Sequence, residues 1–139
     1  MPSVEIREMR EADAAQVIAL WDQVFAYPAP HNRPERAIQD KLAYQPELLF
    51  VATEGEKVLG TVMGGYDGHR GWIYSLAVAP EARRRGIGSA LVRHVEGVLL
   101  AQNCGKVNLQ ILADNDGVVA FYKKLGYTVE PRISMGKVL

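Results

Sequence analysis

The chain has 139 residues, a common length for one domain and enough to bury a hydrophobic core. Its 16 Lys and Arg residues balance its 16 Asp and Glu residues, which argues against a general nucleic-acid or anionic-membrane surface and leaves room only for a local basic patch. The single cysteine, Cys104, excludes an intrachain disulfide and is expected to be a small packed thiol rather than a nucleophile.

The hydropathy pattern bears on the cellular localisation of the protein. Residues 1–10 are polar and charged, unlike a signal peptide, and no apolar run approaches the ~20 residues that span a bilayer. One cysteine also suits a reducing compartment. We therefore expect a cytoplasmic protein that folds as a single domain over residues 1–139.

The first third of the chain predicts one strand and two helices. Residues 4–7 alternate apolar and polar side chains, as a half-buried strand does. A helix is expected from about Glu11, and a second one from Pro34 to about Tyr44. Residues 25–33 contain prolines and aromatic side chains, which predict a loop. The apolar stripe of the first helix is expected to face the core, with Ala14, Val17, Ile18, Leu20 and Trp21.

The middle of the chain predicts an antiparallel meander. Residues 48–53, 58–66 and 72–78 have the length and composition of strands, and turn signals separate them. The turns are residues 54–57 and the pair Asp67-Gly68. Two glycines inside the second strand predict a bend, a bulge or a close approach by another backbone, at Gly64 and Gly65.

A basic turn follows the third strand, with the sequence Arg83-Arg84-Arg85-Gly86-Ile87-Gly88. Apolar residues then recur at helical spacing. Glycines let backbone N–H groups approach a ligand, and a helix start adds unpaired donors, so a phosphate or pyrophosphate is the expected guest. A solvated connection is the alternative. The turn lacks the Gly-Lys-Ser/Thr ending of a P-loop and the third glycine of a dinucleotide fingerprint.

The last third predicts a strand over residues 106–112, parallel to residues 72–78 because a helix connects them. Residues 114–117 supply caps for a further helix, which Gly126 ends. Residues 127–138 are expected to form a final strand or hairpin, with Pro131 at an edge or bend. The fold class is therefore α/β (or α+β), with a mixed sheet of six or seven strands and about four helices.

The order of these elements and three motifs resemble the GNAT superfamily of N-acetyltransferases. The motifs are Leu76-Ala77-Val78-x-Pro80 with Arg83-x-x-Gly86-x-Gly88, then Asn115, then Phe121-Tyr122-x-x-Leu125-Gly126-Tyr127. Residues 60–71 look most like the bacterial YpeA-like branch. The resemblance covers essentially the whole chain, and it implies a mostly antiparallel sheet with two parallel strands splayed apart.

The resemblance implies acetyl-CoA as co-substrate and no metal. In the family, backbone amides of the basic turn hold the pyrophosphate, and the preceding strand pairs with the pantetheine arm. Asn115 matches an asparagine that binds the pantetheine or phosphate region, although a helix cap explains it equally. The residues carried over as cofactor-binding are Leu76, Ala77, Val78, Arg83, Arg84, Arg85, Gly86, Ile87, Gly88, Ser89 and Asn115.

Tyr122 matches the family's tyrosine that protonates the departing thiolate of coenzyme A. A phenol suits this role because its reference pKa of about 10 lies above that of a thiol. A buried core aromatic is the alternative. The general base stays open, because Gln110 stands where some protein N-terminus acetyltransferases of the superfamily have a glutamate. A water relay is favoured over the side chains of Asp67, His69, Glu81 or His31.

The resemblance therefore predicts direct acetyl transfer from acetyl-CoA to a primary amine of a small molecule or peptide. An acyl-enzyme is not expected, since no Cys or Ser lies in an activated setting. A non-catalytic acyl-CoA sensor is the alternative, and a nucleic-acid contact through the three arginines is a weaker one. No nucleic acid or membrane partner is expected, and a homodimer rests on family analogy alone.

Overall fold

The computed structural model describes residues 3–25 and 32–139. Most of the predicted loop at residues 25–33, including Tyr27 and the candidate base His31, therefore lies outside the described residues. The chain separates into two compact units, residues 1–109 and residues 110–139. Each unit is described by itself.

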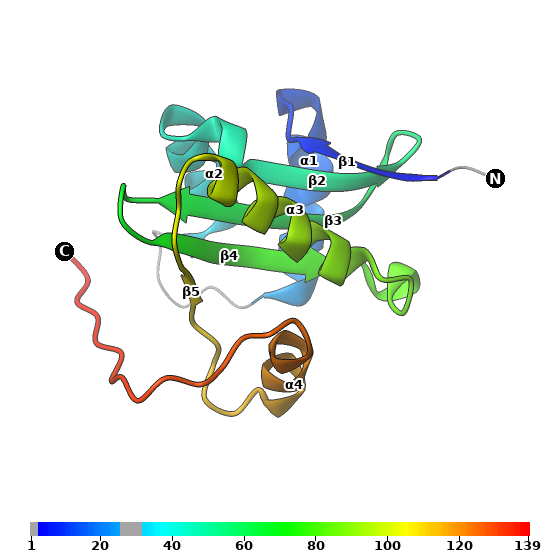
Figure 1. Cartoon of the computed structure of the whole chain (residues 1–139). Coiled ribbons are helices and arrows are strands. Elements are labelled where there is room, and N and C mark those ends of the chain that lie inside the picture. The colour runs from blue at the N-terminus through cyan, green and yellow to red at the C-terminus, as the bar shows by residue number, and fades with distance from the viewer. Residues whose placement is uncertain (1–2, 26–31) are drawn as a thin grey trace. The chain divides into compact units, whose positions relative to one another are not determined.

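The first unit is built on a five-stranded sheet with the strand order β1-β2-β3-β4-β5 (Figure 1). The neighbours β1 to β4 are antiparallel, which confirms the predicted meander, and β4 and β5 are parallel. The strands are β1 (Val4–Glu8), β2 (Leu49–Glu54), β3 (Lys57–Tyr66), β4 (Gly71–Val78) and β5 (Val107–Leu109). The mixed, mostly antiparallel sheet thus follows the predicted fold class.

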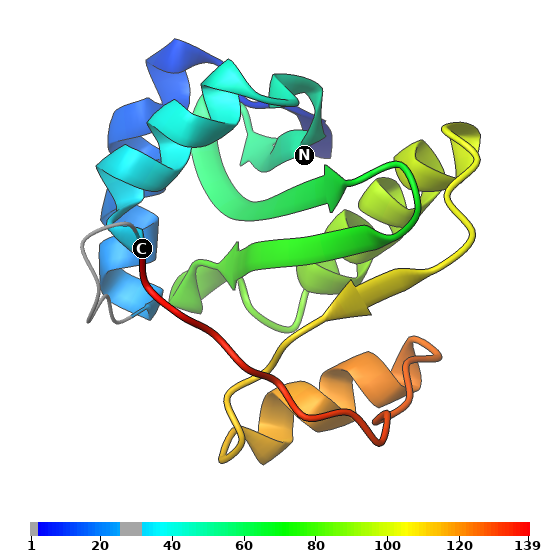
Figure 2. The same cartoon turned by 90° about the vertical axis from the view of Figure 1, so that its left-hand side faces the viewer.

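Three helices cover the two faces of this sheet. The helices are α1 (Ala14–Val24), α2 (Pro34–Ala43) and α3 (Ile87–Ala101). Helices α1 and α2 lie on one face and α3 lies on the other (Figure 2). Small residues let α3 approach the strands, because a Cβ on Gly64 would lie 3.1 Å from Val95 Cγ1 and one on Gly71 would lie 2.8 Å from Leu99 Cδ1.

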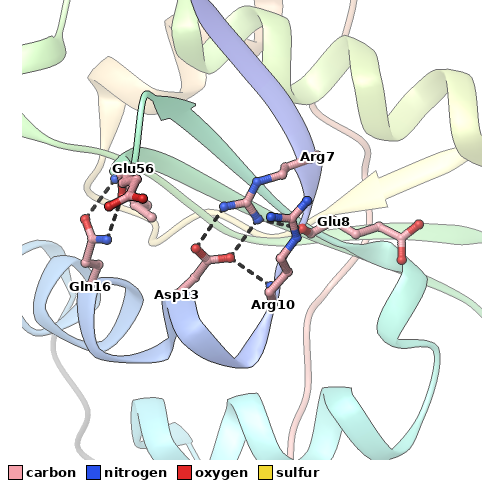
Figure 3. Close-up of polar contacts among 7 residues, drawn as sticks. Arg7, Glu8, Arg10, Asp13, Gln16 and Glu56 are labelled. Atoms are coloured by element: carbon pink, nitrogen blue, oxygen red, sulfur yellow. Dashed lines mark hydrogen bonds and ion pairs between the residues drawn. The ribbon is translucent and has the colours of Figure 1, made fainter.

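Polar contacts fix α1 to the edge and the hairpin of the sheet (Figure 3). The guanidinium of Arg7 on β1 donates to both carboxylate oxygens of Asp13, at 2.8 and 2.9 Å, and the Arg10 N–H donates to the same carboxylate at 2.8 Å. This arrangement lowers the pKa of Asp13, chiefly through the bond from Arg7. One helical turn on, Gln16 bonds the Glu56 carbonyl and the Val58 N–H, both at 2.9 Å. The helix therefore holds the β2–β3 hairpin in place.

The irregularities of β3 lie away from its two glycines. In the pairing of β3 with β2 the register shifts between Ala52↔Gly60 and Thr53↔Val58, which leaves one extra residue in β3. Gly64 and Gly65 pair regularly with Ile73 and Trp72 of β4, so the expected bulge at the glycines is wrong. The register shifts between the pairs Thr61↔Ala77 and Met63↔Tyr74. Residues 75 and 76 of β4 therefore stand opposite a single residue of β3, which is a β-bulge. A Cβ on Gly64 would lie 3.1 Å from Val95 Cγ1 and 3.7 Å from the Leu48 carbonyl oxygen, and one on Gly65 would lie 3.2 Å from Tyr74 Cε2, so the glycines make room mainly for side chains and one of them also for a backbone carbonyl.

The second unit contains α4 (Asp116–Lys124). The Asn115 side chain accepts a hydrogen bond from the Val118 N–H at 3.3 Å and so caps the start of the helix. At the other end Gly126 has φ of 97°, and the Tyr127 N–H donates to the Tyr122 carbonyl at 3.1 Å. This is the glycine-terminated helix end that the sequence predicts.

The predicted final strand or hairpin does not appear. Residues 127–139 contain no strand, and β5 covers three residues rather than residues 106–112, so the described sheet has five strands and not six or seven. The tight turn at Pro131 gives a physical reason, since the Arg132 N–H donates to the Glu130 carbonyl at 2.8 Å and interrupts the extended backbone.

Candidate active site

The β4 strand changes its surroundings at its midpoint. Its parallel ladder with β5 consists of the pairs Gly71↔Val107, Trp72↔Asn108 and Ile73↔Leu109 and then ends, whereas β4 continues to Val78. Within the described part of the first unit, residues 74–78 are thus paired with β3 and not with β5. Leu76, Ala77 and Val78, the strand residues expected to pair with pantetheine, lie in this half.

The bulge at the start of this half is held by buried side chains. Ser75 has φ of 51°, a left-handed conformation that costs a non-glycine residue about 1–2 kcal/mol. Its carbonyl accepts a hydrogen bond from the Thr61 hydroxyl at 2.9 Å, and that hydroxyl accepts one from the Trp21 indole N–H at 2.8 Å. Thr61 and Trp21 are 0% and 1% exposed. These bonds offset the strain of the bulge.

The basic turn leads from β4 into α3. After a 3₁₀ turn at Pro80–Ala82, Arg84 and Gly86 both have left-handed backbones, with φ of 65° and 75°. Helix α3 begins at Ile87, and its first helical bond runs from the Ala90 N–H to the Gly86 carbonyl. The N–H groups of the first turn, on Ile87, Gly88 and Ser89, therefore have no partner within the helix, which makes this end of α3 suitable for an anion.

Two ion pairs join this turn to the β2–β3 hairpin. Arg85 contacts Glu54 at 2.6 Å, and Lys57 contacts Glu81 at 3.5 Å. The Arg85 charge is therefore balanced by a carboxylate, and the turn does not present three unpaired cations as the sequence suggests. Arg83 and Arg84 are exposed. Since Gln16 holds the same hairpin, the position of the turn depends on α1 as well as on α3.

Tyr122 is the buried aromatic residue of α4. Its ring makes edge contacts with Phe121 and Tyr127, at centroid distances of 5.0 and 5.3 Å. Burial raises the pKa of Tyr122 to about 12. The phenol is therefore fully protonated at neutral pH and can serve as a proton donor.

Comparison with known proteins identifies the family. The model of the acetyltransferase (GNAT) family matches residues 14–127. The chain belongs to this family. Acetyltransferases of Yersinia enterocolitica and Sodalis glossinidius are each 43% identical to it, over 98% and 94% of this chain and 96% and 91% of theirs. This GNAT protein is thus an acetyl-CoA-dependent N-acetyltransferase, and its similarity to bacterial acetyltransferases agrees with the predicted branch.

Solved structures share the fold of this acetyltransferase. Ard1 from Thermoplasma volcanium has a TM-score of 0.80 at 28% identity, with 91% of this chain and 84% of that chain covered. The PaiA N-acetyltransferase of Thermoplasma acidophilum, solved with coenzyme A, has a TM-score of 0.80 at 18% identity, with 94% and 93% covered. The latter similarity concerns the fold alone.

Two carboxylates among the candidate bases of the acetyltransferase are poorly suited to accept a proton. The Asp67 carboxylate accepts bonds from the backbone N–H groups of Arg70 and His69, at 2.7 and 2.8 Å, and these bonds lower its pKa. The pKa of Glu81 is also lowered, chiefly by a bond to its own backbone N–H and also by Lys57. The side chain of Gln110, the residue compared above with the glutamate of some protein N-terminus acetyltransferases, donates to the Ser134 hydroxyl at 2.5 Å. His69 is an exposed turn residue.

The sequence did not predict the contacts that hold the bulge of this site. Trp21 was expected in a core stripe or in the wall of an acceptor pocket, and Thr61 and Ser75 as ordinary strand residues. The sequence signal that could have indicated the bulge is Ser75, a polar residue within the largely apolar run from Trp72 to Val78. Cys104 is a packed thiol as predicted, since it is buried and its sulfur donates to the Lys106 carbonyl at 3.2 Å.

Across residues 3–25 and 32–139, no three His, Cys, Asp or Glu side chains gather in a way that could hold a metal ion. Within the same ranges, no helix has both the length and the apolar character needed to cross a membrane.

Proposed function

We propose that the protein transfers an acetyl group from acetyl-CoA directly to a primary amine of a small molecule or peptide. The observation that carries the proposal is the basic, glycine-bearing turn that opens α3 directly after the half of β4 that β5 leaves unpaired. An anion site at a helix start next to a strand edge suits a cofactor with a pyrophosphate and an amide-containing arm.

The proposed cofactor contacts follow from this arrangement. The backbone N–H groups of residues 84–89 hold the pyrophosphate, and Arg83 and Arg84 add positive charge beside it. Residues 76–78 form main-chain hydrogen bonds with the pantetheine arm. Asn115 contributes to the pantetheine or phosphate region through its amide N–H₂, because its side-chain oxygen already accepts the bond that caps α4.

The chemistry needs one bond to form and one to break. The neutral amine nitrogen attacks the thioester carbonyl carbon, the C–N bond forms, and the C–S bond breaks. Tyr122 donates its phenolic proton to the leaving thiolate, and a chain of waters takes the proton that the amine loses. The products are an amide and free coenzyme A, so no covalent enzyme intermediate is needed.

Direct transfer and the water relay are each supported by observations on individual residues. Direct transfer without an acyl-enzyme is supported by Cys104. This thiol is buried and donates to the Lys106 carbonyl, so it is not exposed as a nucleophile. The lowered pKa values of Asp67 and Glu81 support the water relay over either carboxylate. We expect a cytoplasmic enzyme without nucleic-acid or membrane partners, and family analogy favours a homodimer.

The test combines thiol release with a matched pair of tyrosine variants. Purified protein is incubated with acetyl-CoA and a panel of amines, and free coenzyme A is measured. With an amine that reacts, Tyr122→Phe is expected to lower kcat by about a hundredfold, while the acetyl-CoA KM stays within about twofold, because general acid catalysis contributes roughly that factor. Tyr127→Phe removes a neighbouring phenol and serves as the control.

The pH profile gives a second reading of the same step. Because the pKa of Tyr122 is about 12, its proton is present throughout the neutral and mildly alkaline range. The rate is therefore expected to show no fall between pH 8 and about pH 10, where an unperturbed tyrosine would begin to ionise.

An unchanged kcat in Tyr122→Phe removes Tyr122 from the acid role. Saturable acetyl-CoA binding without thiol release from any amine favours the sensor alternative.

A further inference from the structure

A line of three residues connects α1, β3 and the bulge of β4. The Trp21 indole N–H donates to the Thr61 hydroxyl at 2.8 Å, and this hydroxyl donates to the Ser75 carbonyl at 2.9 Å. The first two residues are buried to 1% exposure or less. In a dry interior such bonds persist, because breaking one leaves a polar group without a partner.

The chemistry of the donors gives this line a direction. An indole nitrogen has a hydrogen to donate and no lone pair to accept with, so the Thr61 oxygen must act as the acceptor. The hydroxyl hydrogen is then left to point at Ser75. Trp21 thus favours the hydroxyl orientation in which Thr61 donates to the carbonyl of the bulged residue.

The bulge decides where the following residues face. Met63 and Thr61 of β3, two apart, share one face of the sheet, and their partners Tyr74 and Ala77 are three apart. If residues 74–77 formed a regular strand, Ala77 would lie on the face opposite Tyr74, because side chains alternate along a strand and the two residues are three apart. The position of residues 76–78 therefore depends on the conformation of Ser75, whose φ is 51°.

We propose that Thr61 is a positioning residue for acetyl-CoA and that Trp21 orients its hydroxyl. Together they hold the bulge that presents residues 76–78 to the pantetheine arm. The inference rests on the proposed role of residues 76–78. The inference predicts that Thr61 and Trp21 affect binding of the pantetheine arm and not binding of the pyrophosphate. The basic turn is held separately, by Glu54, Lys57 and the start of α3.

The test separates the two parts of the cofactor. Wild type and variants are titrated calorimetrically with acetyl-CoA and with 3′-phospho-ADP, the nucleotide half that lacks the arm. Thr61→Val keeps the shape but removes the hydroxyl, and it is expected to weaken acetyl-CoA binding by about tenfold and 3′-phospho-ADP binding by less than about twofold. Thr61→Ser restores the hydroxyl and is expected to return acetyl-CoA affinity to within about threefold of wild type.

Thr53→Val, at a buried threonine of β2 that is 2% exposed, measures the general effect of losing a buried hydroxyl and is expected to bind both ligands normally. Wild-type affinity in Thr61→Val, or an equal loss for both ligands, overturns the inference. Should Thr61→Val not fold, Trp21→Phe carries the test, with about a threefold loss for acetyl-CoA alone expected and no loss overturning it. A wild type that binds no acetyl-CoA refutes the proposed function instead.

Discussion

The two halves of β4 belong to one strand but have different neighbours. Residues 71–73 pair with β3 on one side and β5 on the other, and Gly71 and Ile73 are buried. Residues 74–78 pair with β3, carry the bulge and lead into the basic turn. A strand with both edges paired has no backbone groups left for a ligand. The end of the β5 ladder thus leaves residues 74–78 without that neighbour, and this is the strand edge that we propose to bind the cofactor arm.

The largest expected effect comes from filling the paired half. A Cβ on Gly71 would lie 2.8 Å from Leu99 Cδ1 and 2.9 Å from Cys104 Sγ, and both side chains are buried. Gly71→Ala is therefore expected to lower the free energy of unfolding by about 2–3 kcal/mol, as overpacking does. Urea denaturation measures the loss, and acetyl-CoA affinity of the folded protein should not change.

A matched glycine provides the control for that substitution. A Cβ on Gly97 of α3 meets nothing within 4 Å, so Gly97→Ala is expected to be neutral or to stabilise the helix by up to about 1 kcal/mol. If Gly71→Ala weakens acetyl-CoA binding as much as it weakens the fold, the two halves are not functionally separate.

Acid pH offers a test at the opposite edge of the sheet. The Arg7–Asp13 pair lowers the pKa of Asp13, so its stabilising contribution is full above the unfolded value of about 3.9 and is lost as the pH falls through the folded value. Asp13→Asn is expected to cost about 2 kcal/mol at pH 7. The difference between wild type and variant should shrink in urea titrations below about pH 4.

This pH effect should change the free energy of unfolding and leave cofactor binding at residues 74–78 of β4 unaffected. Strand β1 is the edge strand farthest in the sheet order from β5. Acetyl-CoA affinity at pH 7 is therefore expected to be the same in Asp13→Asn and wild type. A difference between wild type and variant that persists undiminished at low pH would show that the ion pair is not its source.

The bulged half can be probed through its strained residue. Ser75 has φ of 51°, which glycine adopts freely and a β-branched residue adopts poorly. Ser75→Gly is expected to be more stable than Ser75→Val by about 1–2 kcal/mol, and to keep acetyl-CoA affinity because the carbonyl that Thr61 holds is retained. Thermal unfolding and calorimetry measure the two quantities. Equal stability of the two variants would mean that the backbone at this position is not left-handed in solution.

The smallest expected effect lies in the turn beyond β4. The Arg85–Glu54 pair is partly exposed, with 43% and 28% of the side chains accessible. A double-mutant cycle with Arg85→Gln and Glu54→Gln is expected to give a coupling of about 0.2–1 kcal/mol, weaker at high salt. A coupling that does not respond to salt would contradict an exposed ion pair.

Much of this architecture follows from local sequence signals. The apolar spacing of Leu91, Val95 and Leu99 predicted α3, and all three are fully buried. Gly126 ended α4 as expected, and Asp67-Gly68 formed the predicted turn. Such features depend on residues a few positions apart, so periodicity and turn chemistry are sufficient to locate them. The final strand predicted over residues 127–138 did not form, because the turn at Pro131 interrupts the extended backbone there.

The sequence by itself determined the family, the expected cofactor and the residues of the turn that is proposed to hold it, because short motifs of neighbouring residues identify them. Only the tertiary structure decided that Arg85 is paired, that the bulge lies in β4, and that Trp21 and Thr61 hold it. The bonds concerned join residues 31, 40 and 14 positions apart. Contacts of that separation are set by how strands and helices assemble, so no local pattern reveals them.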